Sequence, residues 1–253
     1  MKGLLVKDFY CLRKQYGIFL MTIIIVFVIS IMFVFSCKYG NINKGFESMV
    51  KSGMATGNDI SYIARIAMAF CFLIPMALTG NVMELFVDDR DAGFGKLVGA
   101  LPVSIRKRVM SRFISGMIFT VIGCVADIIM AAVLSRLTDI ITFKNYFAII
   151  ITFASLMIMY LSFLILYAYI LGTEKMTLVA VLPLITGVVV VLLVNMKRLI
   201  GFIHNGIFDA NIIKMLFDFI MNKSHLMFAA SLVILAASYL LCVHISDLKR
   251  GVI

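Results

Sequence analysis

Six long apolar runs, separated by polar segments, divide the chain. The first run, Gly17–Ser36, holds about 20 residues without a charged side chain, enough for a helix to cross a hydrocarbon core of about 30 Å. The same pattern predicts five further spanning helices, at Ser61–Met83, Ser111–Leu134, Tyr146–Leu171, Met176–Asn195 and His225–His244. The chain is therefore predicted to be an all-α integral membrane protein with six transmembrane helices, forming one transmembrane domain over residues 1–253.

The residues before the first run, 1–16, predict a helix of another kind. Leu4, Leu5, Phe9 and Leu12 recur at helical spacing, with Lys and Arg residues between them. This pattern favours an amphipathic helix lying along the inner membrane surface. The alternative is a cytoplasmic tail that only orients the first span.

The segment 196–224 is apolar, but its charges are spaced too closely for a clean span. Two short re-entrant helices that dip into the outer leaflet, broken near residues 205–211, fit this pattern better. The polar, Gly-rich and Asn-rich segment 37–60 is predicted to be an external loop.

Composition agrees with a membrane protein, because 63% of the residues are hydrophobic and only 14% are charged. The net charge of +10 arises mostly beside apolar runs, where anionic headgroups explain it better than a nucleic-acid partner. The predicted inner segments hold more Lys and Arg than the outer ones, which favours a cell-membrane protein with both termini in the cytoplasm. The five cysteines are scattered, without the spacing of a metal site.

The segment 84–110 between the second and third runs is the one long stretch where acidic, basic, Gly and Pro residues gather. It is therefore predicted to be a cytoplasmic loop with a short helix at 92–101 parallel to the membrane. Pro102 and Ser104 are start signals for the following helix. The residues that draw attention in this loop are Glu84, Asp88, Asp89, Asp91, Gly93, Leu101 and Pro102.

This loop, with its acidic-then-Gly stretch, its LPVS element and the basic residues that follow, resembles the loop of ABC-2 type transporter permeases. The opening MKGLLVKDFYCLRKQ is also similar to the small Gram-positive branch of that family, which is associated with peptide and bacteriocin export. The resemblance implies a coupling helix between helices 2 and 3, docked through the seven residues above to an ATP-binding subunit. It also implies a homodimer, or a heterodimer with a second permease. The alternative is an ordinary solvated loop whose charges only set topology.

The chain lacks a GxxxxGK[ST] phosphate loop, so ATP and Mg are expected on the partner subunit, with no cofactor and no catalytic residue in this chain. The predicted function is the permease of an ATP-driven exporter of a hydrophobic or amphipathic substrate, most simply a peptide. The alternatives are a secondary transporter, for which matching inverted halves are not apparent, and an intramembrane enzyme, for which an HExxH motif is lacking.

Two charged residues fall inside the predicted spans, Arg65 in the second and Asp127 in the third. Their predicted depths are similar, so they are candidates for an intramembrane charge pair. The alternative is that Arg65 extends outwards to the interface while Asp127 faces an aqueous crevice alone. Pro75, Pro183 and Gly187 are predicted sites of helix bending.

Overall fold

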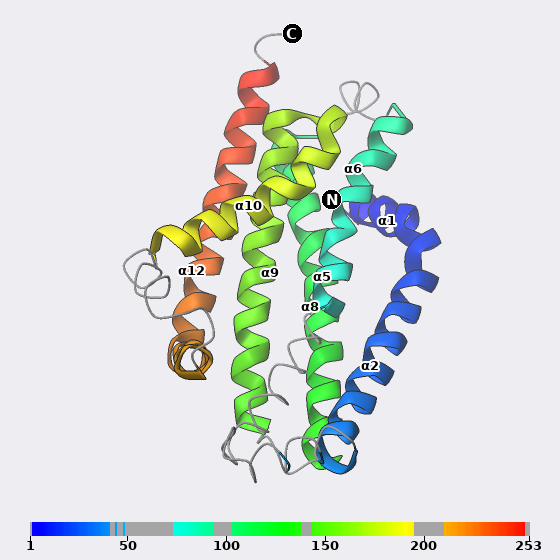
Figure 1. Cartoon of the computed structure of the whole chain (residues 1–253). Helices are drawn as coiled ribbons and strands as arrows, with labels where there is room; N and C mark the ends of the chain where they lie inside the picture. The colour runs from blue at the N-terminus through cyan, green and yellow to red at the C-terminus, as the bar shows by residue number, and fades with distance from the viewer. Residues whose placement is uncertain are drawn as a thin grey trace.

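The computed structural model describes residues 2–40, 44, 48, 73–93, 103–137, 143–194 and 210–250, and the elements assigned in these residues are helices (Figure 1). Four helical stretches are long and apolar enough to cross a membrane: Lys2–Ser36, Ile105–Leu137, Tyr146–Leu171 and Lys223–Leu248. The described residues are thus helical, with four helices of membrane-spanning length, in agreement with the predicted all-α membrane protein. We predicted six spans, and four helices of spanning length are found among the described residues, so the count of six stays a prediction.

The N-terminal residues form helix α1 (Lys2–Cys11), a short 3-10 turn (Leu12–Gln15) and helix α2 (Tyr16–Tyr39). In Figure 1, α1 lies across one end of the bundle and α2 runs along its side. Phe9 of α1 and Phe19 of α2 both pack on Phe119, with ring centroids 5.5 and 5.9 Å away. The predicted apolar stripe of residues 1–16 therefore faces the bundle.

The second apolar run is described from Leu73 onward, as helices α5 (Leu73–Gly80) and α6 (Val82–Asp91). We expected this span to end at Met83, but after a one-residue turn at Asn81 helix α6 continues to Asp91. The reason is that Leu85 and Phe86 remain on the buried side, only 1% and 7% exposed, while Asp88, Arg90 and Asp91 are exposed. Gly93, with φ of 62°, follows the helix end in a conformation that glycine adopts without strain.

Helix α8 (Ile105–Leu137) lies at the centre of the described bundle, in contact with α1, α2, α5, α6, α9 and α12. It begins directly after Ser104, as the start signals predicted, and hence six residues before the predicted span at Ser111. Two glycines allow its neighbours to approach. A Cβ at Gly123 would lie 2.6 Å from the Pro75 Cα, and a Cβ at Gly116 would lie 2.5 Å from a Leu161 methyl.

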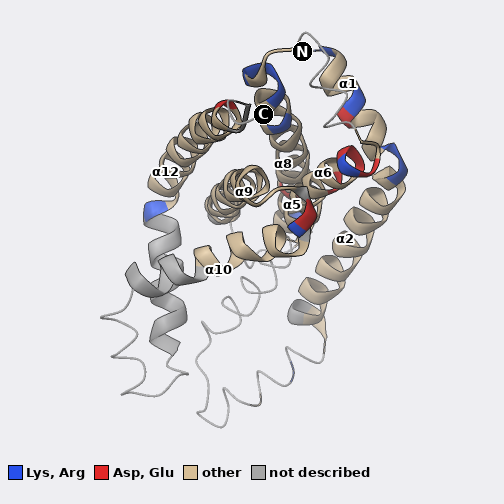
Figure 2. Ribbon diagram, turned by 90° about the horizontal axis from the view of Figure 1, so that it is seen from above, with Lys and Arg blue, Asp and Glu red and all other residues tan. Residues whose placement is uncertain are grey.

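The fourth apolar run forms α9 (Phe143–Leu171), as predicted, and is followed by a 3-10 turn at Thr173–Lys175. Helix α10 (Met176–Val194) has nearly the predicted bounds, but it lies oblique to the long helices (Figures 1 and 2). Helix α12 (Ala210–Arg250) packs along α9. The first part of the predicted re-entrant segment lies outside the described residues, and residues 210–224 belong to α12, in one helix with the last span.

One end of the bundle gathers elements that are far apart in sequence. The helix α1, the end of α6, the start of α8 and the end of α12 all lie there (Figure 1). Seen from above in Figure 2, this end carries Lys, Arg, Asp and Glu residues on α1 and α6. Such a grouping places the start and the end of the segment between α6 and α8 close to the N-terminal helix.

Candidate functional site

A buried carboxylate on α1 is the centre of this charged end. Asp8 is 1% exposed. Its Oδ2 atom accepts hydrogen bonds from the Ser111 hydroxyl at 3.1 Å and the Ser115 hydroxyl at 2.9 Å, and its Oδ1 atom accepts one from Arg112 Nη1 at 2.9 Å. All three donors lie on α8. A buried charge is tolerated only when it is paired and hydrogen-bonded, and Asp8 meets both conditions.

Arg112 joins two carboxylates that come from different helices. Its Nη1 atom donates to Asp8 on α1, and its Nη2 atom donates to Asp89 Oδ2 near the end of α6. The guanidinium also lies over the Phe86 ring, 5.3 Å from the ring centroid. Because a guanidinium presents its donors in a rigid fork, Arg112 fixes α1 and α6 relative to α8.

Lys7 completes the group. Its Nζ atom donates to Asp89 Oδ1 and lies 3.6 Å from Asp8 Oδ1. Burial, followed by the nearby Arg112 charge, lowers the pKa of Lys7, and Asp8 opposes this shift. We call Lys7, Asp8, Asp89 and Arg112 the ionic cluster. It contains two basic and two acidic side chains, so its formal charges balance.

Sequence reasoning identifies only one part of this cluster. Asp89 is among the predicted docking residues, whereas the sequence pattern marks Lys7 and Arg112 only as positive charges near the membrane. It misses Asp8, although this residue lies four positions before Leu12 and four after Leu4, on the same helix face. A charged residue on an otherwise apolar face, with a Ser-Arg-x-x-Ser pattern elsewhere in the chain, is a signal that could have found it.

The other predicted coupling residues lie beside the cluster, as far as the structure describes them. Glu84 is partly buried on α6, and Asp88 and Asp91 are exposed near its end. Gly93 follows, and Leu101 and Pro102 lie outside the described residues. The exposed carboxylates of Asp88 and Asp91 therefore lie within one turn of Asp89, the member of the ionic cluster on α6.

The predicted intramembrane pair is only half visible. Asp127 is 2% exposed in the middle of α8, and its Oδ1 atom has no hydrogen-bond partner among the described residues. Arg65 lies outside the described residues, so their pairing stays a prediction. Of the predicted bending residues, Pro75 is buried against Gly123, Pro183 lies inside α10, and a Cβ at Gly187 would meet no described atom within 4 Å.

Metal chemistry finds no support in the part of the chain that the structure describes, because no three His, Cys, Asp or Glu side chains gather there. The arrangement is that of a helical membrane protein with a charged end. Comparison with known families places it more narrowly. A family model described as "ABC-2 family transporter protein" matches residues 3–247.

Because this match covers nearly the whole chain, the protein belongs to the ABC-2 family of transporters, as the sequence resemblance indicated. It is a membrane component of an ABC transporter, a transport subunit rather than a catalytic one. The search of curated proteins gave no match, and neither did the search of solved structures.

Proposed function

We propose that this chain is the permease of an ABC exporter and that a separate ATP-binding subunit docks on its segment 84–102. ATP, with Mg, binds to that subunit. Docking and release then drive a hydrophobic or amphipathic substrate, most simply a peptide, outwards through a dimer of permeases. The family membership supports the transport role, and the scarcity of charge within the apolar helices favours such a substrate over ions.

The ionic cluster is the observation that carries this proposal. Through Asp89, it joins the α6 part of the segment on which the ATP-binding subunit is proposed to dock to α1 and α8. Ion pairs at an exposed surface contribute about 0–1 kcal/mol and break easily. Breaking a buried pair costs about 3–5 kcal/mol, and Arg112 with Asp8 is such a pair, joining α8 to α1. Asp89 is 21% exposed and attaches α6 to this pair, so a push on α6 is passed to α1 and α8 through Asp89.

The acidic residues of α6 differ in exposure, which suggests different roles for them. Asp88 and Asp91 are exposed; Asp91 accepts a hydrogen bond from Arg90 Nε at 2.8 Å, but that pair is itself exposed, so both carboxylates are accessible to an incoming subunit. Asp89, in contrast, is engaged by Lys7 and Arg112. We therefore assign docking to Asp88 and Asp91, together with Glu84 and Pro102, and transmission of the movement to Asp89.

Co-purification with the ATP-binding subunit tests this assignment. We expect Asp88→Asn/Asp91→Asn to reduce association several-fold, since two of the exposed charges at the proposed interface are lost. We expect Asp89→Asn to retain association but to uncouple ATPase activity from transport. Glu84→Ala and Pro102→Ala should reduce the stimulated ATPase rate.

Asp247→Asn is the matched control, because Asp247 is an exposed carboxylate near the end of α12 at the same end of the bundle. It should leave association and ATPase activity unchanged. Unaltered association and ATPase rates in all of the docking variants would remove the docking assignment.

The proposal also requires the charged end of the bundle to face the cytoplasm, with both termini there and with six spans in all. Ala92 is exposed just after α6 and offers a site to test this. In a chain whose native cysteines are replaced, Ala92→Cys should react with a membrane-impermeant thiol reagent in inside-out vesicles and not in intact cells. Labelling in intact cells would place this end outside, where an ATP-binding subunit cannot reach it.

A further inference from the structure

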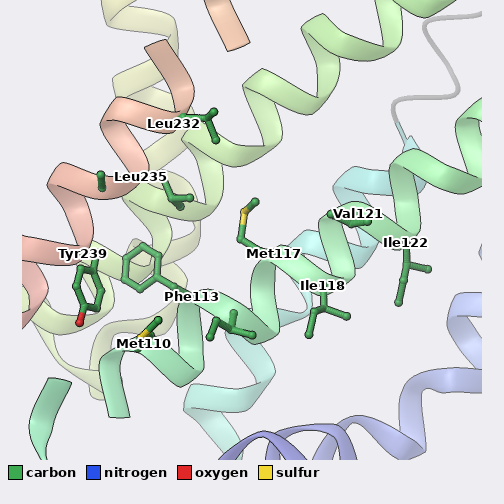
Figure 3. A pocket seen from close by; sticks show the side chains of 11 residues that line it. Met110, Phe113, Met117, Ile118, Val121, Ile122, Leu232, Leu235 and Tyr239 are labelled. Carbon is green, nitrogen blue, oxygen red and sulfur yellow. The ribbon is translucent and has the colours of Figure 1, made fainter. Parts of the chain in front are cut away.

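An apolar groove lies between α8 and α12, on the face of α8 turned away from the Phe119 contact with α1 and α2 (Figure 3). Its volume is about 500 Å³, within the range of about 300–1,000 Å³ typical of ligand sites. Its lining is Met110, Phe113, Ile114, Met117, Ile118 and Val121 with Ile122 on α8, and Leu232, Leu235, Ala236 and Tyr239 on α12. Apart from the Tyr239 hydroxyl, these side chains present no oxygen or nitrogen.

The dimensions of the groove suit a single acyl chain. From Met110 to Ile122 the helix advances about 18 Å at 1.5 Å per residue. One leaflet of a bilayer contributes about half of a hydrocarbon core of about 30 Å. The groove therefore extends through the depth of one leaflet, from the charged end of the bundle inwards. Several of its side chains are open to the surroundings, with Met110 44% and Val121 53% exposed.

Two basic residues lie at the charged end of this groove. Arg106 and Lys107 are exposed in the first turn of α8. Arg106 precedes Met110 by four residues and Phe113 by seven, and Lys107 precedes Ile114 by seven, so both cations lie above the groove-lining face. Their exposed positions leave both side chains accessible to a headgroup.

Tyr239 marks the same end of the groove. Its ring packs edge-on against Phe113, with centroids 5.9 Å apart, and Figure 3 shows it beside Met110 and Phe113. Tyrosine is enriched where hydrocarbon meets headgroups, because one end of its side chain is apolar and the other is polar. Along the groove towards the charged end, the apolar lining comes first, then Tyr239, then Arg106 and Lys107. This order matches the acyl chain, the glycerol region and the phosphate of a phospholipid.

We propose that this groove binds one anionic phospholipid of the leaflet at the charged end of the bundle, with its phosphate on Arg106 and Lys107. A second copy of the chain is a poorer occupant. In a two-fold symmetric contact the same surface meets itself, so the cations of the two copies would be brought together. The lipid, in contrast, brings the opposite charge. This inference does not depend on the proposed function.

The chain has no tryptophan, so one introduced tryptophan reports on the groove. The full chain carrying Leu232→Trp is reconstituted in vesicles that contain dibrominated phosphatidylglycerol or dibrominated phosphatidylcholine, whose bromines quench tryptophan on contact. Each basic residue near an anionic surface contributes about 1 kcal/mol, so we expect a preference for phosphatidylglycerol of up to about 30-fold. Arg106→Gln/Lys107→Gln should reduce it to near unity. Arg136→Gln, at the far end of α8, removes an exposed cation and should preserve it.

A pair of alanines tests the groove itself. Ala236→Phe places a ring in the groove and should lower quenching by both lipids, whereas Ala237→Phe adds the same ring one position along α12, outside the groove lining. Equal quenching by the two lipids in the parent chain would show ordinary surrounding lipid only. Quenching by neither lipid would show a groove covered by a second copy. Either result overturns the proposal. An unchanged preference for phosphatidylglycerol in Arg106→Gln/Lys107→Gln would also overturn it, and this measurement can be made even if Ala236→Phe does not fold.

Discussion

Replacing Arg112 with leucine is expected to lower the stability of the folded chain by about 3–5 kcal/mol, the cost of leaving a buried partner charge uncompensated. Asp8 is 1% exposed and, among the described residues, would keep only Lys7 as a cation, at 3.6 Å. Asp89 would lose its guanidinium partner as well. The apparent melting temperature of the purified chain in detergent, read from loss of the monodisperse species on heating, measures the effect.

Two further variants separate charge from packing. Arg112→Lys should be nearly as unstable as Arg112→Leu, because one ammonium does not reproduce two directed donations to carboxylates on separate helices. Asp8→Asn/Arg112→Gln removes one cation and one anion together, leaving Lys7 with Asp89, so it should be more stable than the sum of the single effects predicts. An additive double variant, or a stable Arg112→Leu protein, would contradict a structural role for the cluster.

Replacing Gly123 with alanine is expected to destabilise the chain by about 1–3 kcal/mol, the usual cost of overpacking a close contact. The new Cβ would lie 2.6 Å from the Pro75 Cα and 2.9 Å from its Cβ, so α5 would have to move away from α8. That movement would also stretch the hydrogen bond between the Thr79 and Thr120 hydroxyls, which are 3.0 Å apart on the same two helices. The same melting measurement applies.

Gly187→Ala is the matched control. Gly187 also lies inside a helix, α10, but a Cβ there would meet no described atom within 4 Å. Alanine has the higher helix propensity, by about 1 kcal/mol, so this variant should be neutral or slightly more stable. If Gly123→Ala were as stable as Gly187→Ala, the contact between α5 and α8 at Pro75 would not be close in the folded protein.

The helices themselves were predictable because apolar runs of sufficient length have few other solutions in a membrane. The first, third and fourth runs became α2, α8 and α9, and the start of α8 after Ser104 followed from local start signals. Boundaries were less predictable at α6, where the chain turns polar at Glu84 while Leu85 and Phe86 continue to pack inwards. Charged residues in the sequence indicate where the chain leaves the hydrocarbon core, but tertiary packing decides where the helix ends.

The sequence by itself determined that this protein is a helical membrane protein of the ABC-2 kind, because hydropathy and a loose family pattern are local properties of the chain. Only the tertiary structure decided which charges meet. Asp8 and Arg112 lie 104 positions apart in the chain, and their ion pair depends on α1 lying across the end of α8. The groove between α8 and α12 likewise depends on how two helices that are far apart in the sequence pack beside each other. Residue spacing along one helix does not predict that packing.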